Sequence, residues 1–297
     1  MEQKPQKVSR AKISRRETGK VGASGGGTRT GSISRAPSVA RSLRNGWEST
    51  DASRPQRSGA PGPSQLGTGE GNHHGNAQTR LPGRIVPRAF FESSPELVTP
   101  RLLGKLLVHR TKAGILAGRI VEAEAYLGPH HDTPDAAAHS YRGPTPRNEV
   151  MFGPPGHAYV YLIYGRYYCM NITCEIPGRA GCILLRALEP VTGIAQMARN
   201  RGLGPDAHPR DLTGGPSRLC LALGLTRLTH NGLDLLDPAS ELQVRDDGFR
   251  VSEVMVTPRI GINPANPALT WPLRFAVPAH PCVSGPKSFT GNCIRIE

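Results

Sequence analysis

Residues 159–173 read YVYLIYGRYYCMNIT, and this stretch constrains the fold more than any other part of the chain. Two runs of aromatic and β-branched residues flank the pair Gly165-Arg166, a pattern typical of two antiparallel strands joined by a tight turn. Glycine at the first turn position favours a type II′ hairpin. Because side chains alternate along a strand, Tyr159 and Tyr161 should share one face, while Tyr164 lies at the tip and faces the other way.

Tyrosine is concentrated in this hairpin. Five of the chain's seven tyrosines lie within ten positions, although aromatic residues make up only 5% of the sequence. Leucine and valine would fill a core equally well, so the crowding of phenol rings has two interpretations. Either the tyrosines cover a core, since aromatic residues favour strands, or they provide a surface on which something flat is stacked.

The flanking segments predict further strands and a few helices. KLLVHRT and GILAGRIVEAEAYLG are expected to be neighbouring strands, and GCILLRALEP, RIGIN and WPLRFAVP to be further strands. Ser94-Pro95 and Thr99-Pro100 each have the form of a helix start, and TGIAQMARNRG and GPSRLCLALGL are expected to be helical. Residues 128–156 form a long Gly- and Pro-rich excursion of a kind that is often functional. We therefore expect one α+β domain over residues 86–297.

Residues 1–85 have a different composition. They hold 15 Lys and Arg against 5 Asp and Glu, whereas residues 86–297 hold 22 against 18. Because this basic Ser/Gly/Arg-rich tail has few large aliphatic residues, we expect it to be disordered. It is either a tail that holds anionic polymers by charge, the product of a start codon assigned too early, or an organelle-targeting peptide. No run of 18 apolar residues occurs, so no membrane span is expected.

The six cysteines form no C-x-x-C pair, which favours reduced and mostly buried thiols in an intracellular chain. His130, His131, Asp132 and His139 lie near one another in a polar loop, where solvated side chains are the usual outcome. We therefore expect neither a metal site nor a cofactor.

The strand RIVEAEAYLG brings two carboxylates and a phenol to one face, since Glu122, Glu124 and Tyr126 alternate with small apolar residues. A buried carboxylate is costly unless it is paired or used. This face is either the exposed side of an edge strand or carries a general base, which cleavage of a glycosidic bond requires. In the second case Tyr126 and Tyr161 are candidates to stack on a flipped base, and Tyr164 is a candidate wedge.

Taken together, six segments resemble the alkyladenine (3-methyladenine, methylpurine) DNA glycosylases: GRIVEAEAYLG, AHSYRGPTPRN, MFGPPGHAYVYLIYGRYYCMNI, GCILLRALEP, GGPSRLCLALG and WPLRF. The resemblance runs from about residue 88 to 297 in the same order. It implies a curved, mainly antiparallel sheet with a protruding hairpin, similar to a C-terminal domain of methionyl-tRNA formyltransferases. The implied enzyme is a monomeric base-excision-repair glycosylase that needs no cofactor. It would flip alkylated or deaminated purines out of duplex DNA and hydrolyse the N-glycosidic bond with activated water. The implied substrates are 3-methyladenine, 7-methylguanine, hypoxanthine and ethenoadenine.

The resemblance also implies roles for individual residues of the reaction site. Glu124 would be the general base, and Arg186 would help to hold the water and the backbone phosphate. Asn171 would lie at the pocket floor and disfavour the exocyclic amino group of normal guanine. The remaining residues that would bind the damaged base are Tyr126, His139 and Tyr161.

Three more residues are implied to contact DNA. Tyr164 would enter the minor groove, and Arg142 and Arg147 would bind phosphates. The segment between Tyr126 and His139 is a few residues longer than the family form, so the alignment of His139 against His130 and His131 is open. Glu122 receives no role.

Two other functions fit part of this pattern. One is a nucleic-acid-binding protein of the same fold without catalysis, against which Glu124 argues. The other is a hydrolase of free nucleosides or small glycosides, which would need no wedge at the hairpin tip. Only Lys105, Lys112 and Lys287 follow residue 85, and none is placed for Schiff-base chemistry, so we expect a monofunctional enzyme. It would work in the cytoplasm at the nucleoid of a prokaryote, or in the nucleus or an organelle of a eukaryote.

Overall fold

The computed structural model describes residues 81–285 and 291–296, all of which belong to one unit within residues 35–297. The predicted tail therefore lies outside the described residues, except for its last five positions. There, strand β1 (Arg84–Ile85) already pairs with strand β7 (Leu242–Asp246). Within the described part, no helix has the length and apolar character needed to cross a membrane.

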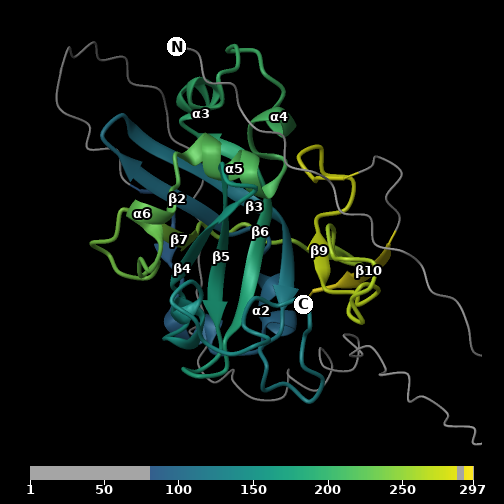
Figure 1. Ribbon diagram of the computed structural model, residues 1–297. Coiled ribbons are helices and arrows are strands. Elements are labelled where there is room, and N and C mark those ends of the chain that lie inside the picture. The colour runs from purple at the N-terminus through teal and green to yellow at the C-terminus, as the bar shows by residue number, and fades with distance from the viewer. Residues whose placement is uncertain (1–80, 286–290, 297) are drawn as a thin grey trace, which may run out of the picture. The chain divides into compact units, whose positions relative to one another are not determined.

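Ten strands among the described residues form one sheet, and each strand pairing is antiparallel (Figure 1). The main path runs β1-β7-β2-β3-β6-β5-β4, and strands β9, β8 and β10 branch from β3. The other strands are β2 (Leu106–Thr111), β3 (Gly114–Tyr126), β4 (Ala158–Ile163), β5 (Tyr167–Cys174), β6 (Gly181–Thr192), β8 (Glu253–Thr257), β9 (Arg274–Ala276) and β10 (Asn292–Arg295). The structure thus confirms the predicted α+β domain with a mainly antiparallel sheet.

Strand β3 lies at the branch point of the sheet. Its first half pairs with β2, its second half pairs with β9, and its other edge pairs with β6. The register with β6 shifts on both sides of Glu122, and such irregularities bend a strand and increase its twist. The strand that carries Glu122, Glu124 and Tyr126 is therefore held from both edges, not exposed at one.

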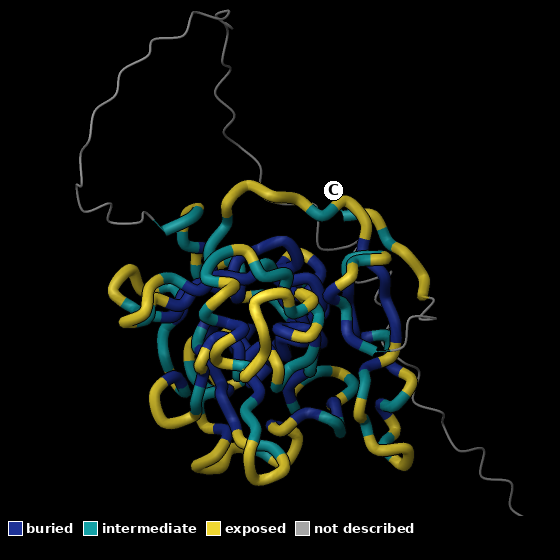
Figure 2. The backbone as a smooth tube through the Cα atoms, turned by 90° about the horizontal axis from the view of Figure 1, so that it is seen from above, coloured by how far each residue is buried: buried dark blue, intermediate teal, exposed yellow. Residues whose placement is uncertain are grey.

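Helices α2 and α5 pack against one face of this sheet and enclose the main core. Val160, Ile172 and Leu185 of the sheet share a buried cluster with Val98 of α2 and Leu219 of α5. Figure 2 shows the buried segments gathered at the centre and the exposed ones in peripheral loops. The helices are η1 (Arg88–Phe91), α2 (Pro95–Leu102), η2 (Glu149–Phe152), α3 (Ile194–Arg201), α4 (Pro209–Thr213), α5 (Pro216–Leu223) and α6 (Arg227–His230). Five of the six cysteines are buried thiols, as expected.

Three local predictions were wrong. Thr99-Pro100 does not start a helix, because Pro100 lies inside α2, which begins after Ser94. RIGIN is not a strand, because β8 ends at Thr257 and the following loop turns inward, where Arg259 is buried against Asp135.

The third error concerns the turn of the tyrosine hairpin. Strand β4 ends at Ile163, so the turn begins one residue earlier than predicted and includes Tyr164 itself. The Arg166 N–H donates to the Ile163 carbonyl over 3.2 Å, and Tyr164 and Gly165 have φ angles of 49° and 69°. Two central residues with positive φ make this a type I′ arrangement, not type II′.

Candidate active site

A row of side chains crosses four adjacent strands on the sheet face opposite the main core. Glu124 pairs with Leu184, Leu184 pairs with Asn171, and Asn171 pairs with Tyr159. Residues directly opposite each other in antiparallel strands point to the same side. The register therefore brings Glu124 of β3, Asn171 of β5 and Tyr159 of β4 onto one face.

Glu124 is fully buried, and three donors fix its carboxylate. The Ile260 N–H donates to Oε1 over 2.8 Å, and the Tyr126 hydroxyl donates to Oε2 over 3.0 Å. Nη1 of Arg186 lies 3.2 Å from Oε1. An ionised carboxylate has about four acceptor positions, so this one can still accept a hydrogen bond from a water molecule. The predicted base is thus an oriented, paired carboxylate.

Glu122 holds Arg186 in place beside Glu124. Its Oε1 accepts hydrogen bonds from Nε of Arg186 over 2.9 Å and from Nε of Arg274 over 2.7 Å. The backbone N–H and the hydroxyl of Ser284 complete the shell of Glu122. Burial alone would lower the pKa of Arg186, but the charges of Glu124 and Glu122 raise it above its ordinary value. The guanidinium therefore stays charged and buried between two carboxylates.

Tyr126 is held by a buried ion pair that the sequence analysis missed. The guanidinium of Arg259 lies 4.4 Å from the centroid of the Tyr126 ring, and Nη2 of Arg259 donates to Asp135 over 2.9 Å. Burial and then the charge of Glu124 raise the pKa of Tyr126 well above its ordinary value, so the phenol keeps its proton. Residues 135 and 259 lie 124 positions apart, and no local pattern signals such a pair.

Three aromatic side chains gather next to this group. The rings of Tyr159 and Tyr161 stack with centroids 5.0 Å apart and an angle of 23° between their planes. The His139 ring meets Tyr161 edge-on at 4.7 Å, and its Nδ1 lies 3.0 Å from the hydroxyl of Tyr159. Tyr126 packs against the same cluster. Burial raises the pKa of Tyr159 to about 12, so this hydroxyl also keeps its proton.

The structure brings His139 to the tyrosines, unlike the two neighbouring histidines. His131 pairs with Glu175 at 3.0 Å between its Nε2 and the carboxylate, and His130 is exposed on the loop. His139 itself is open to solvent on one side. The geometry therefore places His139, and neither His130 nor His131, beside the aromatic cluster.

Asn171 is buried on the same face and has an unused acceptor. Its Nδ2 donates to Sγ of Cys182 over 3.0 Å, while its Oδ1 is buried without a hydrogen-bond partner among the described residues. Buried polar atoms are nearly always paired. The Oδ1 atom therefore marks a position where a bound polar group would gain a hydrogen bond.

Tyr164 lies apart from the cluster, at the tip of the hairpin. Its side chain is 91% exposed, whereas that of Tyr161 is 8% exposed. The left-handed backbone of Tyr164 is unfavourable for a residue with a side chain, and such strain is concentrated at functional sites. The two tyrosines thus occupy opposite environments, as predicted, although Tyr164 is set apart by its place in the turn and not by alternation along the strand.

Arg142 and Arg147 flank the site on the loop before β4. Both are exposed, and both line a cavity of about 530 Å³ together with His139 and Tyr159. The guanidinium of Arg147 also lies 5.7 Å from the centroid of the Tyr161 ring. Positive charge therefore surrounds the open side of the aromatic cluster.

Comparisons with known proteins identify the family of this chain. A family model described as methylpurine-DNA glycosylase matches residues 89–281. A protein of Koribacter versatilis (strain Ellin345) is 52% identical over 200 residues, which cover 67% of this chain and 93% of the relative. A protein of Alkaliphilus oremlandii (strain OhILAs) is 43% identical over 205 residues, which cover 67% of this chain and 98% of the relative. Both are named "Putative 3-methyladenine DNA glycosylase". The chain belongs to the methylpurine-DNA glycosylase family, a family of DNA-repair hydrolases.

Proposed function

We propose that this protein is a monofunctional glycosylase of base-excision repair, which flips damaged purines out of duplex DNA and hydrolyses their N-glycosidic bonds. The observation that carries the proposal is the buried carboxylate of Glu124, oriented by Tyr126 and Arg186 on the sheet face that carries the aromatic cluster. Its substrates would be 3-methyladenine, 7-methylguanine, hypoxanthine and ethenoadenine. The protein would act as a monomer and need no cofactor for this reaction.

The proposed hydrolysis uses one water molecule and the carboxylate of Glu124. The water oxygen forms a bond to the sugar C1′ as the N-glycosidic bond breaks. The water's proton passes to Glu124, and the bonding electron pair leaves with the purine. Arg186 keeps the carboxylate in position, because Glu122 fixes the guanidinium from its other side. The products are a free base and an abasic site.

Recognition of the base would depend on the flat rings. The flipped purine would stack between Tyr126 and Tyr161, with the edge of His139 beside it. A purine made cationic by alkylation gains from contact with electron-rich phenol rings and is also a better leaving group. The unpaired Oδ1 of Asn171 supports a role for this residue in reading the edge of the base.

Contacts with the duplex would come from the hairpin tip and the loop before it. Tyr164 is exposed and protrudes, so its ring can fill the gap that the flipped nucleotide leaves in the stack. Arg142 and Arg147 are exposed beside the aromatic cluster and would bind the flanking phosphates.

The family resemblance also supports a similarity between this sheet and a C-terminal domain of methionyl-tRNA formyltransferases.

Water, and no amine, is the nucleophile in this proposal. Lys105 is buried and its Nζ pairs with Asp246 of β7 over 2.8 Å. In the sheet, β2, β3 and β6 lie between β7 and the strands β5 and β4 of the tyrosine hairpin. An amine held as an ammonium ion in a salt bridge is a poor nucleophile. The enzyme should therefore leave abasic sites without cleaving the strand.

The decisive experiment uses duplex oligonucleotides that each carry one hypoxanthine or one ethenoadenine. The protein is incubated with each duplex, and the abasic sites are then cleaved with alkali. Cleavage that appears only after alkali supports the proposal, whereas cleavage without alkali contradicts the monofunctional reaction. The same assay is also run on duplexes that contain 3-methyladenine. If the protein binds all of these duplexes but releases no base from any of them, it is a non-catalytic DNA-binding protein. Release from free inosine but not from DNA would identify a nucleoside hydrolase.

A further inference from the structure

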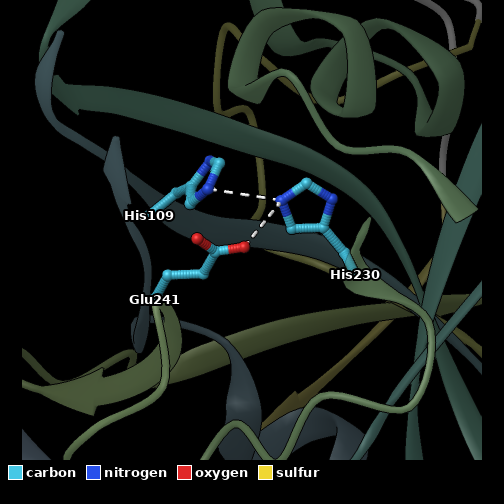
Figure 3. Close-up of side chains that lie close together, drawn as sticks. All are labelled: His109, His230 and Glu241. Atoms are coloured by element: carbon cyan, nitrogen blue, oxygen red, sulfur yellow. Dashed lines mark hydrogen bonds and ion pairs between the residues drawn. The ribbon is translucent and has the colours of Figure 1, made fainter. Parts of the chain in front are cut away.

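Three side chains that the proposed reaction does not use lie close together beside strand β2. His109 lies on β2, His230 is the last residue of α6, and Glu241 directly precedes β7 (Figure 3). Their nearest donor atoms all lie within 4.8 Å of one another. The two histidines are buried, and the carboxylate side chain of Glu241 is about half exposed to solvent. Strand pairing explains the meeting, because His109 lies opposite Leu242, the neighbour of Glu241.

The distances match those between ligands of a small divalent metal. Nε2 of His109 lies 3.3 Å from Nε2 of His230, which in turn lies 3.7 Å from Oε1 of Glu241. Zinc binds imidazole nitrogen and carboxylate oxygen at roughly 2.0–2.2 Å in tetrahedral geometry, so two of its ligand atoms lie roughly 3.3–3.5 Å apart. The two nitrogens already have this spacing, and Oε1 of Glu241 lies only slightly beyond it from Nε2 of His230. The carboxylate is farther from His109, within 4.8 Å, and its half-exposed side chain would have to turn toward His109 to complete the site.

The orientation of the rings also fits a shared cation. A straight hydrogen bond between the two imidazoles would separate their centroids by the nitrogen–nitrogen distance plus two ring radii. The centroids are only 4.9 Å apart, and the ring planes are at 86°. The contact between the two nitrogens is therefore bent, not straight. Figure 3 shows the Glu241 carboxylate to one side of the line between the two nitrogens.

In each ring, Nδ1 faces away from the proposed metal and lies near a backbone carbonyl, which is a usual partner of a metal-bound histidine. Nδ1 of His109 lies 2.8 Å from the Leu223 carbonyl, so it must donate, and Nε2 carries the lone pair. Nδ1 of His230 accepts a hydrogen bond from the Thr226 N–H over 3.0 Å and also lies 3.2 Å from the Thr226 carbonyl. A metal at Nε2 would require the other tautomer, in which Nδ1 donates to that carbonyl.

We propose that His109, His230 and Glu241 bind one divalent transition metal of the zinc type, with a solvent water as the fourth ligand. Two imidazoles and one carboxylate suit zinc in ligand type and number. The metal would join β2, α6 and the residue before β7 and so fix α6 against β2. The residue after α6, Asn231, accepts a hydrogen bond from Val160 of β4 over 3.0 Å. The metal would thus support the strand that carries Tyr159 and Tyr161, and its role would be structural.

The test measures metal binding by the full chain after treatment with EDTA. Calorimetric titration with Zn²⁺ should show one equivalent bound at this site, and the melting temperature should rise with free Zn²⁺. Titration with Co²⁺ should give the visible bands of a tetrahedral nitrogen and oxygen site. A sulfur-to-metal charge-transfer band would place the metal on a cysteine and overturn the proposal.

Variants locate the bound metal. Losing an outer hydrogen-bond partner of a metal ligand costs about 10- to 100-fold in affinity, so Glu241→Gln and His230→Asn should each weaken binding by at least that factor. Glu241 is half exposed, so its variant should fold even if a change at the buried His230 disturbs the core. The matched control is His130→Asn at an exposed histidine, which should bind like the parent. The proposal fails if the parent binds no metal, or if Glu241→Gln binds metal as tightly as the parent does.

Discussion

The hydroxyl of Tyr126 donates a hydrogen bond to Oε2 of Glu124 over 3.0 Å, which joins a proposed base-stacking ring to the proposed general base. Tyr126→Phe keeps the ring and removes only this donor. A hydrogen bond to a charged group contributes about 1.5–3 kcal/mol, so single-turnover excision should fall by about 10- to 150-fold. Binding of damaged duplex should change little. An unchanged excision rate would mean that the hydroxyl does not position the carboxylate.

Glu124→Gln should abolish base release and leave the binding of damaged DNA largely intact. The amide has the size of the carboxylate but cannot accept the proton of water, and general base catalysis contributes about 100- to 10,000-fold. Single-turnover excision and equilibrium binding are measured on the same duplex. Because the variant loses the ion pair with Arg186, its melting temperature shows whether it remains folded. Near-normal excision by the folded variant rules out Glu124 as the base.

Tyr164→Ser and Tyr161→Ser should differ in their dependence on the DNA context. Tyr164 is exposed at the tip, so its loss should slow excision from a matched duplex more than from a mismatched one, where unstacking costs less. Tyr161 is buried beside His139, so its loss should slow excision in every context. Rates are compared on duplexes that differ only in the opposing base. If Tyr164→Ser lowers the excision rate equally on all of these duplexes, Tyr164 does not act as a wedge.

Deletion of residues 1–80 should leave excision intact and reduce the salt dependence of binding to undamaged DNA. This segment holds 14 Lys and Arg against 5 acidic residues. Each phosphate that a protein neutralises contributes about −0.9 to the slope of log affinity against log salt concentration. The deletion stops before Arg84, because β1 belongs to the sheet. An unchanged salt slope would favour a targeting peptide or an early start codon over a DNA-holding tail.

Asp246 should contribute stability that depends on pH. Burial alone would raise its pKa, but hydrogen bonds from Lys105, Gly248 and Arg250 lower the pKa from 3.8 to about 2. A depressed pKa stabilises the fold above the unfolded value, and this contribution is lost as the pH falls from about 4 to 2. Allowing for solvent screening, Asp246→Asn should cost about 1–2 kcal/mol at pH 7.

Urea denaturation of both proteins at pH 7 and pH 3 tests this effect. The difference in unfolding free energy between parent and Asp246→Asn should shrink to about half at pH 3. A difference that stays constant between the two pH values would show that the charge of Asp246 contributes nothing.

Elements with a strong local pattern were predictable from the sequence. The alternation around Glu122, Glu124 and Tyr126 and the aromatic runs of β4 and β5 identified the strands and their faces. The position of Tyr164 at the tip followed from the predicted turn at Gly165-Arg166, although the turn itself begins one residue earlier. These features depend on neighbours within a few positions, which a sequence displays directly.

Contacts between distant segments were not predictable in the same way. No role could be predicted for Glu122 from the sequence, yet in the structure it accepts hydrogen bonds from Arg186, Arg274 and Ser284. The segment RIGIN, which begins at Arg259, was expected to be a strand. Its conformation is decided instead by a buried pair with Asp135, which tertiary packing alone brings together. The same holds for His109, His230 and Glu241.

The left-handed backbone of Tyr164 has a consequence for protein engineering. A non-glycine residue in this region costs about 1–3 kcal/mol, and glycine at the same position would relieve that strain. Selection for heat resistance alone would therefore favour Tyr164→Gly, although the substitution deletes the ring proposed to enter DNA. At this position an improvement in thermostability and a loss of repair would come from one and the same change.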